Sequence, residues 1–257
     1  MAYSPSPELT AAVAEVERVF AGAPVDVRRP GGFPFRFDEA DLELLSTPDA
    51  ALPSNLAESA AASWWYWDDR LPDVIRRVLP DVARMLPHDK LFYPARMFRG
   101  VAHAVWQQWP EDEAAAVLRL LDAWWADTLR RPFRDVEVAD VLDACAVATG
   151  SFGRWLDAWD RERTWAADLH LASVALCWTH ESTIDLDACW ADGREELDRW
   201  LAGAARERMA GVGAHPQLVW RLGLYALPEA ERGSDAVSAL YSELPYLDEW
   251  GGRWGQA

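Results

Sequence analysis

The chain has 257 residues, of which 51% are hydrophobic, so it is long enough to bury a sizeable core and is not globally disordered. Its formal net charge is −17, from 42 acidic and 25 basic residues, which argues against binding to nucleic acids or to anionic membranes. A protein that binds a basic partner or a small ligand fits this charge better.

The cysteines and the N-terminal sequence indicate a cytoplasmic protein. Cys145, Cys177 and Cys189 are odd in number and lie in apolar surroundings, which is typical of reduced thiols. The first 20 residues lack a basic region followed by an apolar run, so we expect no signal peptide. No apolar stretch reaches about 18 residues without a charge, so we expect no membrane span.

The N-terminal part of the chain predicts short helices and one extended arm. Ser6-Pro7-Glu8 is typical of a helix start, and Gly22 of a helix end. Residues 22–37 alternate apolar side chains on both sides of a Pro-Gly-Gly turn and finish in three alternating phenylalanines, which predicts an aromatic arm laid across the helices. Further helices are expected over Asp38–Ser46 and Ser54–Tyr66.

The sequence Leu-Pro-Asp-Val occurs twice, at Leu71 and again at Leu79. Each copy is typical of a helix start with proline at the first helical position. Either two short helices follow one another, or one helix kinks at Pro80. A further helical pattern covers Tyr93–Trp109.

The clearest helix of the sequence lies between Trp109 and Pro132. Pro110 suits the first helical position, where the missing N–H costs nothing. Three acidic residues follow Pro110 and two arginines precede Pro132, so the charges at both ends match the helix dipole. Apolar residues recur every three or four positions between these ends, which predicts an amphipathic helix in contact with several neighbours.

The rest of the chain is also helical in pattern, so we predict an all-α fold of about ten helices. Its architecture is an irregular multi-helix bundle or a short HEAT-like α-α superhelix, in a single domain over residues 1–257 with loose termini at 1–7 and 251–257. The later predicted helices are Arg134–Ala148, Phe152–Glu162, Thr164–His180, Ile184–Arg208, Pro216–Ala226 and Ser234–Leu244.

Tryptophans recur over residues 103–160, in His103-Ala-Val-Trp106, Trp109-Pro110, Trp124-Trp125 and Trp155-Leu-Asp-Ala-Trp159. Together with Val117, Leu121 and Val141-Leu142, this pattern resembles uncharacterised Trp-rich helical proteins of actinobacteria. The composition agrees, because Lys90 is the only lysine and such usage is typical of a GC-rich genome. The resemblance implies a helical fold and no known activity.

One stretch of this acidic chain is locally positive, because no acidic residue lies between Lys90 and Gln108. Three basic residues spaced three and four positions apart share one face of the predicted helix, with a tyrosine one turn earlier. Such a face could hold a phosphate or carboxylate through bidentate arginine contacts. Alternatively, the arginines pair with nearby acids such as Asp68, Asp69 and Asp89. The candidate anion-binding residues are Tyr93, Arg96, Arg99 and His103.

The 16 tryptophans form a second candidate site. Adjacent tryptophans cannot both point into the same core, so some lie at helix seams or on the surface. Tryptophan and arginine are also enriched at interaction hot spots. The alternative is that these large residues simply fill a helical core. The candidates for an aromatic surface or pocket are Trp64, Trp65, Trp67, Trp106 and Trp109.

Two weaker patterns concern metals. Asp68-Asp69-x-x-x-Asp73 beside an aromatic cluster is similar to the magnesium-diphosphate motif of class I terpene synthases. However, Pro72 interrupts its spacing and the second metal motif of that family is missing downstream. Asp68 or Asp69 could instead cap the helix that begins at Pro72.

The other metal pattern combines two histidines with two cysteines, the ligand types of a Cys₂His₂ zinc site. Three of the four share one face if the helix over residues 164–180 is continuous. Cysteines on apolar helix faces are more often small core residues, so we expect no metal and no cofactor. The weak zinc candidates are His170, Cys177, His180 and Cys189.

The sequence contains no nucleophile elbow, P-loop, dinucleotide-binding glycine pattern or H-E-x-x-H helix. It therefore favours a non-catalytic, acidic, cytoplasmic protein that binds a protein partner, as an adaptor or immunity-type protein does, and a basic partner would complement the net charge. The first alternative is a small-molecule or anion-binding protein that uses the arginine and histidine face. The second is a helical lyase similar to terpene synthases.

Overall fold

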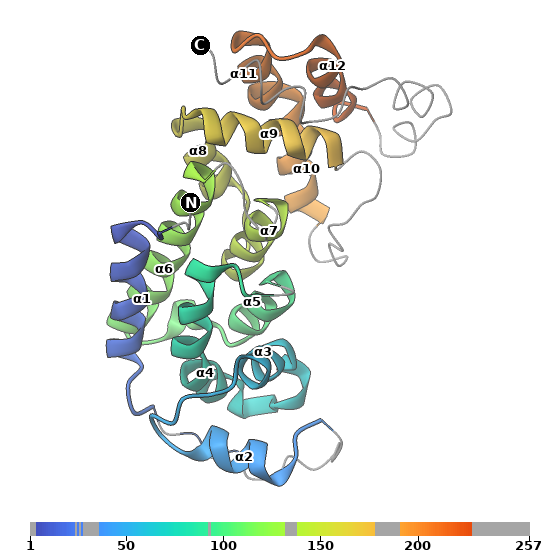
Figure 1. Cartoon of the computed structure of the whole chain (residues 1–257). Helices are drawn as coiled ribbons and strands as arrows, with labels where there is room; N and C mark the ends of the chain where they lie inside the picture. The colour runs from blue at the N-terminus through green and yellow to red at the C-terminus, as the bar shows by residue number, and fades with distance from the viewer. Residues whose placement is uncertain are drawn as a thin grey trace. The chain divides into compact units, whose positions relative to one another are not determined.

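The structure is a computed structural model that describes residues 4–23, 25, 27, 36–91, 94–131, 138–177 and 191–227 (Figure 1). Every regular element in these residues is helical, and no strand occurs among them. The predicted all-α multi-helix bundle is therefore confirmed. Helices α10 (Ala191–Trp200) and α11 (Arg206–Gly211) join without a break through a π-helical segment, η6 (Leu201–Ala205).

The chain divides into two compact units. Unit 1 comprises residues 1–128 and 134–150, and unit 2 comprises residues 129–133 and 151–257. The prediction of a single domain stays a prediction, because compactness alone does not show whether two units unfold together. The HEAT-like alternative concerns the arrangement of the whole chain and also stays a prediction.

Unit 1 contains seven of the described α-helices, and α6 extends two residues beyond it. These are α1 (Pro7–Val19), α2 (Glu39–Ser46), α3 (Ser54–Ala62), α4 (Leu71–Met85), α5 (Pro94–His103), α6 (Glu111–Arg130) and α7 (Val138–Thr149). Among the described residues of this unit, four short 3₁₀ turns lie between these helices: η1 (Trp64–Tyr66), η2 (Asp68–Arg70), η3 (Leu86–His88) and η4 (Trp106–Gln108).

Unit 2 contains α8 (Gly153–Arg161), α9 (Trp165–Cys177), α12 (Pro216–Leu224) and the continuous helix α10–η6–α11. A buried arginine holds its core together. Arg208 donates to the Asp168 carboxylate (2.6 Å) and to the carbonyl oxygens of Trp159 and Glu162 (2.7 Å each). This network ties α11 to α8 and α9, so Arg208 is a structural residue.

Several helix ends form as predicted, because their capping residues are local. The Ser6 hydroxyl accepts a hydrogen bond from the backbone N–H of Leu9 and starts α1. Asp38 and Asp41 form a reciprocal capping box at the start of α2. Helix α6 begins after Pro110 and ends at Arg130, with acids in its first turn and a base in its last.

Other predicted boundaries are wrong. The helix expected over residues 54–66 ends at Ala62 and is followed by the 3₁₀ turn η1. The helix expected over residues 93–109 ends at His103 and is followed by η4. The first position of α4 follows Arg70, which makes no side-chain cap, so neither aspartate before it is the N-cap. Pro80 lies inside α4, which decides in favour of one helix over two.

Some predicted features lie largely or wholly outside the described residues. Of the aromatic arm, only residues 22, 23, 25, 27, 36 and 37 are described, and Val25, Val27 and Phe37 are buried. The predicted helix over residues 234–244 and the loose tail over 251–257 are not described. No described helix combines the length and apolar character that crossing a bilayer requires.

Helix α5 packs against α3 on one side and α7 on another within unit 1 (Figure 1). Gly100 makes the contact with α3 possible, because a Cβ atom at this position would overlap the carbonyl oxygen of Ala61. The two backbones therefore meet closely one turn after Arg96 and one turn before Trp64. This contact positions Arg96 relative to the turn that carries Trp64 and Trp65.

Candidate functional site

Most of the tryptophans proposed as a surface are buried. The indole N–H of Trp67 donates to Ala60 O (2.8 Å), that of Trp106 to Ala148 O (2.8 Å) and that of Trp109 to Ala104 O (3.1 Å). A buried indole N–H needs such a partner, so these three side chains belong to the core of unit 1. They do not form an exposed aromatic surface.

Trp64 and Trp65 differ from the other candidates, because they reach the surface from η1. Trp65 is 49% exposed and Trp64 is partly exposed. Their rings meet edge to face, with centroids 5.7 Å apart and planes 84° apart. The short 3₁₀ turn that follows α3 sends these two rings outward while Trp67 enters the core.

Three basic side chains surround this aromatic pair. The guanidinium carbon of Arg96, on α5, lies 5.5 Å from the Trp65 ring centroid, and that of Arg36 lies 5.8 Å from it. Both distances fall within the range of cation–π attraction. The imidazole of His103, at the end of α5, stacks on Trp64 with centroids 3.8 Å apart. We call Arg36, Trp64, Trp65, Arg96 and His103 the Trp65 site.

Phe37 explains why Arg36 reaches this place from a distant part of the sequence. The Phe37 side chain is buried, and its ring lies 4.9 Å from that of Trp67 and 5.3 Å from that of Tyr66. Anchoring Phe37 beside η1 holds the neighbouring Arg36 close to Trp65. Sequence reasoning missed Arg36, since no local spacing connects it with α5.

The arginines of the Trp65 site differ in pairing from several other arginines of the described chain. Arg76, Arg119 and Arg208 each bind a carboxylate at 2.6 to 2.7 Å. Within the part of the chain that the structure describes, no carboxylate forms an ion pair with Arg36 or Arg96. The alternative in which acids on neighbouring helices neutralise Arg96 therefore finds no support in these residues.

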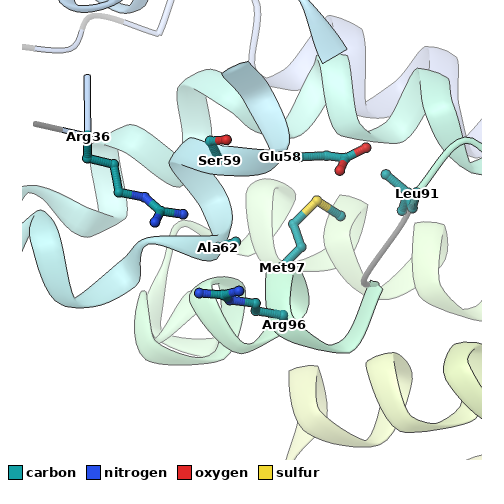
Figure 2. Close-up of a pocket in the computed structure, with 7 residues that line it drawn as sticks. All are labelled: Arg36, Glu58, Ser59, Ala62, Leu91, Arg96 and Met97. Carbon is teal, nitrogen blue, oxygen red and sulfur yellow. The ribbon is translucent and has the colours of Figure 1, made fainter. Parts of the chain in front are cut away.

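Arg36 and Arg96 also line a pocket of about 130 Å³ beside the exposed indole. In Figure 2 both guanidinium groups lie on one side of the pocket, and the Glu58 carboxylate points away from them toward Leu91. The lining residues are Arg36, Glu58, Ser59, Ala62, Leu91, Arg96 and Met97. Two guanidinium groups in a partly apolar pocket can bind an oxyanion that is attached to an apolar group.

The predicted anion-binding face is thus brought together only in part. Arg96 and His103 lie at the Trp65 site, whereas Arg99 is partly buried in unit 1 and Tyr93 lies outside the described residues. The spacing of three and four correctly places the basic residues on one helix. It does not indicate which neighbouring element they face.

No family model, curated protein or solved structure matches this chain. Function is therefore inferred from the geometry of its own side chains.

The aspartate motif does not have the geometry of a magnesium site on one helix. Asp68 and Asp69 lie in the 3₁₀ turn η2, with Asp68 in the left-handed region at φ 47°, whereas Asp73 belongs to α4 and pairs with Arg76 at 3.3 Å. No group of three or more potential ligands from His, Cys, Asp and Glu could hold a metal ion among the residues described. These observations give no support to the lyase alternative.

The zinc candidates fall mostly outside the description. His180 and Cys189 are not described, and of Cys177 only its place at the end of α9 is known. His170 is buried, and its Nε2–H donates to the carbonyl oxygen of Arg131 at 2.5 Å. That ring nitrogen serves a backbone contact, so the zinc interpretation stays an untested prediction.

Proposed function

We propose that this chain is a non-catalytic cytoplasmic binding protein that recognises a protein partner through the Trp65 site. The observation that carries the proposal is the half-exposed Trp65 indole next to two guanidinium groups with no described acid partner. Tryptophan and arginine dominate binding energy at protein interfaces, because they bury much area and form several directed contacts. An adaptor or immunity-type role fits such a site.

A single exposed tryptophan would not be enough, since isolated apolar residues are common on protein surfaces. Trp220, on α12, is such a residue and is 39% exposed. No cation–π contact to Trp220 occurs among the described residues, in contrast to Trp65. This difference makes Trp220 a suitable control.

The proposal is tested by affinity capture followed by a measured affinity. Immobilised wild-type protein, Trp65→Ala and Trp220→Ala are exposed to lysate of the natural host, and the bound proteins are identified by mass spectrometry. A partner is expected on the wild type and on Trp220→Ala. Calorimetry with the purified partner is expected to show at least about tenfold weaker binding by Trp65→Ala. Equal Kd values for all three chains would overturn the proposal.

A second candidate function is the binding of a small anionic molecule, favoured by the presence of Arg36 and Arg96 in one pocket. In that case native mass spectrometry of gently isolated wild-type protein is expected to show the added mass of a bound small molecule, and the same measurement on Arg96→Ala is expected to show none. The absence of any Arg96-dependent mass, with a captured protein partner, leaves the first function as the better one.

A further inference from the structure

We infer that the Trp65 site binds an acidic segment of its protein partner. One carboxylate of that segment enters the pocket beside Arg36 and Arg96, and the adjoining apolar part lies on the Trp65 indole. This inference rests on the proposed function and specifies the chemistry of the partner. It runs against the net charge of −17, which by itself favours a basic partner.

The positive charges of the two arginines in the pocket, and not the net charge of the chain, favour a negatively charged ligand group. A guanidinium offers five N–H donors, and the described residues provide no carboxylate in ion-pair contact with either arginine. Arg96 also stands in the first turn of the ten-residue helix α5, where the positive end of the helix dipole favours an anion. A bound carboxylate would accept charge-assisted hydrogen bonds from both side chains.

The size of the pocket indicates a macromolecular ligand. Pockets that hold whole small molecules have volumes of about 300 to 1,000 Å³. The volume here is about 130 Å³, which suits a carboxylate group better than a whole nucleotide. Most of the ligand must therefore lie outside the pocket, where the exposed indole provides a flat apolar contact. A peptide segment has both parts, an acidic side chain and an adjoining apolar surface.

The charge of the pocket lining favours a carboxylate over a phosphate. Two guanidinium groups line the pocket on one side, and the Glu58 carboxylate lines it farther from them. A carboxylate carries one negative charge, whereas a phosphate monoester carries nearly two at neutral pH. The second negative charge of a phosphate would enter a pocket that a carboxylate also lines, so an unmodified acidic segment is the better match.

The test uses the full chain and two fluorescein-labelled peptides, Gly-Glu-Glu-Phe-Glu-Glu-Gly and the same sequence with glutamine for every glutamate. Fluorescence anisotropy at 100 mM salt and pH 7 gives the Kd values. The acidic peptide is expected to bind at least about tenfold more tightly than the glutamine peptide. Phenylalanine in both peptides keeps the indole contact the same.

Substitutions then assign the binding to the site. Arg36→Ala, Arg96→Ala and Trp65→Ala are each expected to weaken acidic-peptide binding by about five- to tenfold or more. Arg161→Ala, which removes an exposed positive charge from α8, and Trp220→Ala are the matched controls and should leave the Kd unchanged. All five side chains are exposed, and circular dichroism with urea unfolding verifies that each variant is folded.

Three results would overturn the inference: equal binding of the two peptides, unchanged binding by Arg36→Ala and Arg96→Ala, or displacement of the acidic peptide by inorganic phosphate at a lower concentration than by acetate. The proposed function fails separately. If a partner binds in a Trp65-dependent manner but the acidic peptide does not displace it, the proposed function stands and the inference is overturned. Arg96-dependent peptide binding without any Trp65-dependent partner would show that the site binds acidic segments, but it would overturn the proposed function and with it the assignment of that segment to a protein partner.

Discussion

The Glu58 carboxylate lines the same pocket as the two arginines of the Trp65 site. A negative charge there opposes an acidic ligand, so we expect Glu58→Gln to bind the acidic peptide about two- to fivefold more tightly. Anisotropy titration measures the change. The control is Glu43→Gln, an exposed position of α2 that alters the net charge equally. Weaker binding by Glu58→Gln would show instead that Glu58 positions the arginines.

Ser63, directly before Trp64, has a buried hydroxyl group that adds nothing to the stability of the fold. Its Oγ atom is inaccessible to solvent and has no hydrogen-bond partner among the residues that the structure describes. Removing an unpaired buried polar group takes away a desolvation cost, so Ser63→Ala is expected to raise the free energy of unfolding by up to about 1 kcal/mol. Urea unfolding measures it. A loss of stability would indicate that the hydroxyl binds an ordered water.

At the scale of elements, the contact between α3 and α5 depends on Gly100. A Cβ atom there would overlap the Ala61 carbonyl oxygen, and backbone cannot move aside as a flexible side chain can. Gly100→Ala is therefore expected to lower the free energy of unfolding by about 1 to 3 kcal/mol, and to weaken peptide binding by displacing Arg96. Urea unfolding and anisotropy measure the two effects.

The matched control is Gly203→Ala in η6, where a Cβ atom would meet nothing within 4 Å. Alanine loses less entropy on folding into a helix than glycine does, so this variant should be as stable as the wild type or more stable by up to about 1 kcal/mol. Equal effects at the two positions would contradict the role assigned to Gly100.

Helices α1 and α6 are linked by an ion pair that makes stability depend on pH. Both Glu15 oxygens accept hydrogen bonds from Arg119, at 2.6 Å each, and these bonds lower the pKa of Glu15 below its ordinary 4.5. A carboxyl group whose pKa is lowered by folding stabilises the fold above its unfolded pKa. This contribution disappears as the pH falls through the folded pKa.

Glu15→Gln is therefore expected to be less stable than the wild type at pH 7, with a difference that shrinks toward pH 3. The effect is modest, because the Arg119 side chain is half exposed and water screens the pair. Urea unfolding at pH 7, 5 and 3 measures it, with Glu43→Gln as the control. A constant difference at all three pH values would contradict the link to Glu15 ionisation.

The helices predicted best are those whose ends are encoded locally. The cap at Ser6, the capping box at Asp38 and the charged ends of α6 are properties of a few adjacent residues, and all three form. The errors lie where tertiary packing overrides a helical pattern. The α-helix is replaced by a 3₁₀ turn at residues 64–66 and again at residues 106–108. These turns allow Trp67, Trp106 and Trp109 to reach hydrogen-bond partners in the core.

For the whole molecule, sequence reasoning identifies four of the five residues of the Trp65 site, but it assigns them to two separate candidate sites. Arg96 and His103 follow from helical spacing, and an exposed member of the Trp64–Trp65 pair follows from their adjacency. Arg36 does not follow, since it stands 60 positions before Arg96 and reaches the site only through the burial of Phe37. Contacts between distant segments depend on the packed core, which a single sequence does not specify.

The net charge of −17 predicts how an acidic ligand approaches the protein. At 10 mM salt the screening length is about 30 Å, so the whole negative surface repels the acidic peptide before it meets the arginines. At 100 mM salt the length falls to about 10 Å, which screens distant acids more than the close contacts at Arg36 and Arg96. The association rate constant of the acidic peptide should therefore rise several-fold between these conditions.

Stopped-flow anisotropy measures this rate constant, and the glutamine peptide, which carries the same label but lacks the four glutamate charges, is the control, with a rate expected to depend less on salt. A basic ligand would show the opposite trend, because the same field would attract it and salt would weaken the attraction. An association rate of the acidic peptide that falls with added salt would mean that the local positive charge of the Trp65 site governs the encounter. The prediction that the net negative charge of the protein slows the approach of the acidic peptide would then be wrong.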